Sequence, residues 1–98
     1  MLIERVEEEI DLLKRHIDIL KIAKEKGPIG MGKISELTGI PKHKIRYSLR
    51  ILEKEDLIKP TNEGAVAKNV EKFWENFSDK VKFEIEKMKE MDNTLDSF

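Results

Sequence analysis

The sequence has no cysteine and only two histidines among its 98 residues. The lack of cysteine excludes disulfide bonds, thiolate metal sites and thiol nucleophiles. A zinc site would have to depend on carboxylates, which rarely hold zinc without histidine or cysteine. We therefore expect neither a metal nor a cofactor.

Long apolar runs are also missing. No stretch approaches the roughly 18 apolar residues of a membrane span, and no apolar segment follows Met1 as a secretion signal would require. We therefore expect a cytoplasmic protein without membrane contact, and its length fits one domain over residues 1–98. Because neither an isolated carboxylate pair nor a Ser-His-Asp arrangement is indicated, we expect that it is not an enzyme.

The net charge of −1 hides an uneven distribution of charge. Residues 1–20 carry six acidic and three basic side chains, and residues 62–98 carry nine acidic and six basic ones. Residues 21–61, in contrast, carry ten basic and five acidic side chains. A basic centre between acidic ends allows one surface to meet a polyanion while the rest is repelled from it. Chance variation along solvated faces explains the totals equally well.

Residues 1–26 are predicted to form a helix with two apolar stripes. The first stripe has the spacing of a coiled-coil surface and contains Ile3, Val6, Ile10, Leu13, Ile17 and Leu20. The second lies at least about a quarter-turn away and contains Leu12, Ile19, Ile22 and Ala23. We predict that one stripe packs on its own domain and the other on a second subunit. The spacing leaves open which stripe does which, and also that both serve one core.

Residues 68–91 predict a second long helix, followed by a frayed tail at 92–98. One face repeats with a 3.6-residue period through Val70, Trp74, Phe77, Val81, Ile85 and Met88, and Phe73 widens it. This helix is longer than a small domain needs to close its core, which favours dimerisation. The predicted dimer interface contains Ile3, Val6, Ile10, Leu13, Ile17, Phe73, Trp74, Phe77, Val81, Ile85 and Met88.

Between the long helices, residues 31–55 predict two shorter helices joined by the turn Gly39-Ile40-Pro41, and residues 57–67 predict a short β-hairpin. The helix over 42–55 has a buried stripe of Ile45, Leu49 and Leu52. Its opposite face carries His43, Arg46, Tyr47, Arg50 and Lys54, with Lys42 and Lys44 at the flanks. Arginine can bind guanine through two hydrogen bonds, while lysine, histidine and tyrosine reach phosphates or base edges. A solvated cationic surface is the alternative.

The run Ile34-Ser35-Glu36-Leu37-Thr38-Gly39-Ile40-Pro41, followed by Ile45, Leu49, Leu52-Glu53 and Leu57-Ile58, resembles the winged helix-turn-helix superfamily, particularly small archaeal and bacterial transcriptional regulators. The resemblance implies a mostly α fold with a short β-hairpin wing and long terminal dimerisation helices. It also implies a homodimer that reads a roughly palindromic operator in double-stranded DNA through the helix 42–55. The residues expected to reach bases or the groove are His43, Arg46, Tyr47 and Arg50. Those expected to contact phosphates are Lys33, Lys42, Lys44, Lys54 and Lys59.

Three features depart from the family pattern. The helix 42–55 begins with Lys42-His43-Lys44, where relatives often have small hydroxyl residues, which favours phosphate contact over base reading. Asp56 stands where the family usually has glycine, although aspartate tolerates the left-handed conformation. The tip of the hairpin, Thr61-Asn62-Glu63, carries an acid and no arginine, which puts a wing contact with DNA in doubt. Two other functions therefore stay open: a protein-protein interaction module, which an apolar face on helix 42–55 would favour, and RNA binding by the same basic patch.

Overall fold

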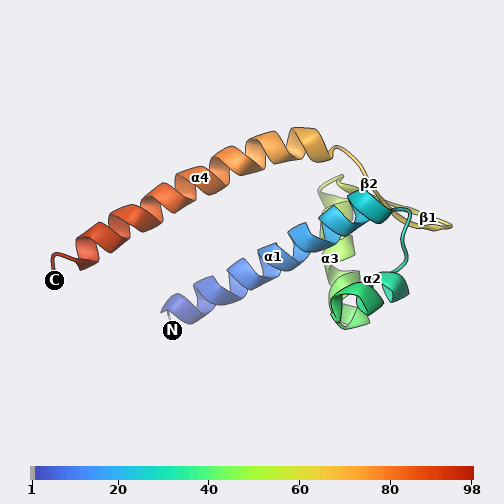
Figure 1. Ribbon diagram of the computed structural model, residues 1–98, viewed down its shortest axis with the longest axis horizontal. Coiled ribbons are helices and arrows are strands. Elements are labelled where there is room, and N and C mark those ends of the chain that lie inside the picture. The colour runs from blue at the N-terminus through green and yellow to red at the C-terminus, as the bar shows by residue number, and fades with distance from the viewer. Residues whose placement is uncertain (1) are drawn as a thin grey trace.

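The computed structural model describes residues 2–98, so Met1, the first residue of the predicted N-terminal helix, lies outside the described part. The elements follow in the order α1 (Leu2–Lys26), α2 (Met31–Thr38), α3 (Lys42–Lys54), β1 (Ile58–Thr61), β2 (Gly64–Ala67) and α4 (Val70–Leu95). The predicted mostly helical architecture with one short antiparallel hairpin is confirmed. Figure 1 shows a body of α2, α3 and the hairpin at one end, from which α1 and α4 extend in the same general direction.

The core forms where three helices meet. Ile19 of α1, Ile34 of α2 and Ile45 of α3 are completely buried. Each such side chain contributes about 1.5–3 kcal/mol through the apolar surface that it removes from water. The other buried apolar residues are Leu20, Ala23, Ile29, Leu52, Leu57, Ile58 and Ala65. Only the C-terminal half of α1 contributes to this core.

The burial of α1 decides which of its stripes packs inward. Ile19 and Ala23 of the second stripe are buried, together with Leu20 of the first. The N-terminal half of the first stripe faces solvent, since Ile3 is 64% exposed and Ile10 is 48% exposed. The second stripe therefore packs in the domain's own core. The alternative that both stripes serve one core is wrong for the N-terminal half of α1, where the first stripe is exposed.

The segment between α1 and α2 pairs with the hairpin through an isolated bridge. Ile29 and Ala65 exchange both backbone hydrogen bonds, at 3.1 and 2.8 Å. Gly64 lies beside this bridge with φ of +129°, and a Cβ there would be 2.4 Å from the carbonyl carbon of Ile29. Glycine is thus required where the hairpin passes this close to another backbone.

Exposed polar contacts join the start of α4 to the base of the hairpin. Asp56 and Asn69 both have left-handed backbones, with φ of 60° and 58°, so the tolerance predicted for Asp56 is confirmed. Asn69 Nδ2 donates to the carbonyl of Asp56 at 2.9 Å and to its carboxylate at 3.2 Å. Lys68 also pairs with this carboxylate. These contacts connect the turn after α3 with the residue before α4.

Helix α4 differs from its prediction at both ends. It begins at Val70 instead of 68, and it continues to Leu95 instead of ending at 91. In this last stretch Thr94 Oγ1 donates to the carbonyl of Glu90 at 3.0 Å. None of the residues of α4 is fully buried. No helix in residues 2–98 has the length and hydropathy needed to cross a membrane.

Gly64→Ala tests the close approach of the hairpin to Ile29. We expect a loss of several kcal/mol of unfolding free energy, because the new methyl group meets backbone atoms and the positive φ is strained. Gly32→Ala is the matched control, because no atom lies within 4 Å of the added Cβ and the site is helical. The control should be neutral or stabilise by up to about 1 kcal/mol. Equal urea-unfolding midpoints for Gly64→Ala and the natural chain would contradict this packing.

Candidate nucleic-acid interface

Helix α3 separates apolar and basic residues onto opposite faces. Ile45 and Leu52 are buried, and Leu49 is half-buried against the same core, as the sequence predicted. Ser48 lies on this buried face and is fully covered, which the sequence reading did not assign. The opposite face is exposed and consists of Lys42, His43, Lys44, Arg46, Tyr47, Arg50, Glu53 and Lys54. The face presented to solvent is therefore basic rather than apolar.

The five cations of α3 have no ion-pair partner within residues 2–98, whereas seven of the other fourteen lysines and arginines there have one. Elsewhere Lys14 pairs with Asp18 at 3.0 Å, and Lys24 pairs with Glu71 at 3.3 Å. Within residues 2–98, no carboxylate lies within ion-pair distance of the lysines and arginines of α3. Their mutual repulsion is left uncompensated, so an added anion would gain their full attraction.

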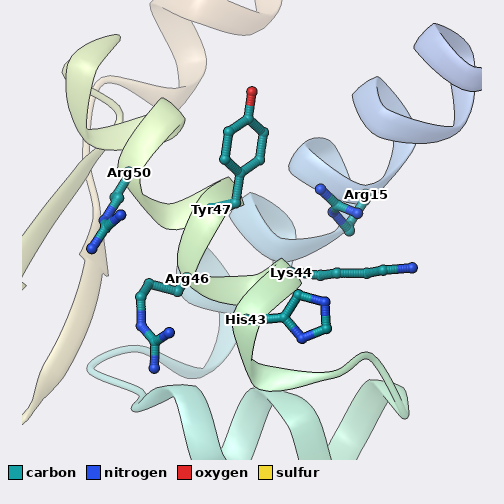
Figure 2. Close-up of a pocket in the computed structure, with 6 residues that line it drawn as sticks. All are labelled: Arg15, His43, Lys44, Arg46, Tyr47 and Arg50. Carbon is teal, nitrogen blue, oxygen red and sulfur yellow. The ribbon is translucent and has the colours of Figure 1, made fainter.

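A shallow hollow of about 500 Å³ brings the basic residues of α3 together with one residue of α1. Figure 2 shows these side chains around the exposed side of α3, with Arg15 approaching from α1. The lining residues are Arg15, His43, Lys44, Arg46, Tyr47 and Arg50. All four residues predicted to reach bases or the groove are thus neighbours, while Arg15 was missed. Its contribution could be seen only once α1 was known to cross α3.

The predicted phosphate-contacting lysines are more scattered. Lys44 lines the hollow, and Lys54 lines an adjoining one with Tyr47 and Arg50. Lys33 of α2 lies outside it and pairs with Glu36 at 3.8 Å. Lys42 and Lys59 are exposed and also lie outside the hollow. The sequence therefore grouped residues that the fold distributes over α2, α3 and β1.

Arg15 is held in place by a buried polar contact between α1 and α3. Its Nε donates a hydrogen bond to Ser48 Oγ at 3.0 Å. The same oxygen lies 2.7 Å from Nδ1 of the buried His16. Burial, with a smaller contribution from the Arg15 charge, lowers the pKa of His16 from its ordinary value of 6.5. His16 is therefore a packing residue whose Nδ1 has a hydrogen-bond partner.

The predicted interface residues of α1 and α4 stay accessible. Val6 and Leu13 are exposed like Ile3 and Ile10, and so are Trp74, Ile85 and Met88. Ile17, Phe73, Phe77 and Val81 are half-buried, and Phe73 packs against the core. At the root of the two helices, a groove is lined by residues that include Ile17, Leu20, Phe73 and Trp74. Both helices therefore keep apolar surface that their own domain does not cover.

Within residues 2–98, no cluster of three or more histidine, aspartate or glutamate side chains is placed to hold a metal ion. Comparison with known proteins finds no matching family model and no matching curated protein.

The His16 contact predicts a pH dependence of stability. Because the pKa is lowered in the folded protein, the unfolded chain binds a proton first as the pH falls below 6.5. The stabilisation is fully present above that value and is lost as the pH falls through the lower, folded-state pKa. Between about pH 7.5 and pH 5, the unfolding free energy should therefore decrease more for the natural chain than for His16→Gln. Parallel urea-unfolding series with equal decreases would contradict it.

Proposed function

We propose that this protein is a dimeric, DNA-binding transcriptional regulator of winged helix-turn-helix type. It reads a roughly palindromic operator by placing α3 in the major groove. The observation that carries the proposal is the exposed face of α3, whose cations have no partner among residues 2–98. Phosphates fix the position of such a helix, and Arg46 and Arg50 can then reach base edges.

The character of this face favours DNA over the other two candidates. A helix that docks on a protein offers an apolar stripe, and the exposed residues of α3 are mostly charged. An RNA duplex has a major groove too narrow for a helix, whereas the groove of B-form DNA admits one. The acidic terminal segments also support an orientation in which α3 faces the DNA. The N-terminal half of α1 and most of α4 extend away from the body that carries α3 (Figure 1), so they would lie far from the DNA.

The second subunit is proposed to cover the exposed stripes of α1 and α4. The radius of gyration is 16.1 Å, whereas a compact chain of this length has about 13 Å. Residues 3–14 of α1 carry five acidic and two basic side chains, so pairing two such segments would be repulsive. Residues 80–89 of α4 carry four basic and two acidic ones. We therefore place α1 of one copy against α4 of the other, which buries both stripes and compensates the charges.

Charge reversal on α3 tests the DNA contact. Arg46→Glu combined with Arg50→Glu should weaken binding to a labelled duplex about 100-fold or more, because two attractive contacts become repulsive. The matched control is Lys26→Glu with Lys72→Glu, which changes the charge equally at exposed positions of α1 and α4, outside the two hollows beside α3 and outside the segments 3–14 and 80–89 that are proposed to pair. Fluorescence anisotropy at moderate salt measures both. Equal affinity of the α3 variant and the natural chain would rule out the groove contact.

Selection from a random duplex library at two salt concentrations, with structured RNA as competitor, separates the remaining functions. A consensus half-site would support an operator-reading regulator. Affinity without a consensus would mean a general polyanion binder, and stronger competition by RNA would favour RNA as the partner.

The dimer has its own test. Ile10→Gln removes apolar surface from the exposed stripe and should raise the dimer dissociation constant at least about tenfold. Glu8→Gln, on the opposite side of α1, is the control and should leave it nearly unchanged. Sedimentation equilibrium at micromolar concentration measures both constants. A natural chain that sediments as a monomer would contradict the proposed dimer.

A further inference from the structure

Arg15 reaches the basic face of α3 from a different helix, and a buried side chain fixes its position. Ser48, which accepts its Nε–H at 3.0 Å, is completely covered in the contact between α1 and α3. A serine at this position is small enough for the two helices to approach. The hydrogen bond to Ser48 therefore holds Arg15 at Nε, the innermost nitrogen of its guanidinium group. The side chain lines the same hollow as Lys44 and Tyr47 (Figure 2).

The hydrogen bonds of Ser48 leave the outer nitrogens of Arg15 available. An arginine Nε only donates, so Ser48 Oγ accepts from it. His16 Nδ1 lies 2.7 Å from the same oxygen, so both partners of Ser48 come from α1. No carboxylate among residues 2–98 lies within ion-pair distance of Arg15. Its remaining N–H donors can therefore serve a ligand.

With α3 in the major groove, Arg15 would lie toward one of the two strands that border the groove. A helix is about 10–12 Å wide and the major groove about 12 Å, so a helix in the groove has a sugar-phosphate strand along each flank. Arg46 and Arg50 line the groove between α3 and the hairpin. Arg15 and Lys44 lie on the α1 side (Figure 2). The strand that follows the α1 side of α3 would thus pass Arg15.

We propose that Arg15 binds a backbone phosphate of the DNA strand on the α1 side of α3, and that Ser48 is the residue that positions it. This inference rests on the proposed function, because it takes α3 to lie in the groove. The guanidinium fork matches two phosphate oxygens, which a lysine cannot do. Because Ser48 already restricts the side chain, less conformational entropy is lost when the phosphate binds.

The test uses the salt dependence of binding to a labelled duplex of random sequence, about 30 base pairs long. Each phosphate contact contributes about 0.9 to the slope of log K against log salt, measured between about 50 and 200 mM. Arg15→Gln should reduce the magnitude of this slope by about 0.9 per subunit and weaken all sequences equally. Glutamine retains an N–H donor for Ser48, so the variant should stay folded, and thermal unfolding checks this.

Two variants separate a phosphate contact from a structural role. Arg15→Lys keeps the charge and should keep the slope, while affinity falls several-fold because the fork is lost. Lys14→Gln is the matched control, since this neighbour pairs with Asp18 and lies outside the hollow. It should change neither quantity. A slope that is the same for Arg15→Gln and for Lys14→Gln would overturn the assignment of Arg15.

The outcomes also separate this inference from the proposed function. If the Arg46→Glu, Arg50→Glu variant loses binding but Arg15→Gln keeps the natural slope, only the role of Arg15 fails. If neither variant changes binding, both proposals fail. Inorganic phosphate at constant ionic strength distinguishes a free-phosphate site from a strand contact. Competition by phosphate that depends on Arg15 would mean a free-anion site and would overturn the strand contact.

Discussion

The close packing of α1 across α3 is the contact on which the rest of the structure depends. Ile19 and Ile45 bury the apolar side of this contact, and Ser48 closes its polar side with His16. Because the apolar face of α3 packs against the core, the basic residues on its opposite face are exposed to solvent. The same contact brings Arg15 to the edge of that face. One helix crossing thus sets both the core and the charge pattern of the surface.

The sequence was sufficient for features that depend on local periodicity. The spacing of Ile45, Leu49 and Leu52 identified the inner face of α3, and Gly39-Ile40-Pro41 identified the turn before it. Residues that depend on contacts between distant segments were not predictable in this way. No local sequence pattern indicates that Arg15 lies beside α3. The bridge between Ile29 and Ala65 depends on a close approach of two backbones, and the glycine at position 64 is the one local feature consistent with it. Ser48 did have a signal, since a serine within an apolar stripe requires a hydrogen-bond partner.

Helices α1 and α4 show how a small chain divides its apolar residues between two purposes. The core takes Ile19, Leu20 and Ala23 from one end of α1 and leaves Ile3 and Ile10 at the other end uncovered. Leu37 of α2, an apolar residue of the run that carries the resemblance, is likewise 46% exposed. Sequence periodicity detects an apolar face but does not tell which molecule covers it. A chain with a core of this size gains additional stability if a second copy covers the rest.

The joint between Asp56 and Asn69 determines how freely α4 can rotate relative to the rest of the domain. Its hydrogen bonds are exposed, so water can replace them, and beyond its first turn α4 has no core contact to hold its angle. A helix of 26 residues is about 39 Å long, so a rotation of about 10° at its base moves its far end by about 7 Å. Helix α4 is thus a lever on a compliant pivot. In the proposed dimer, a rotation of this kind would change the separation of the two α3 helices by several ångströms while each core stays intact.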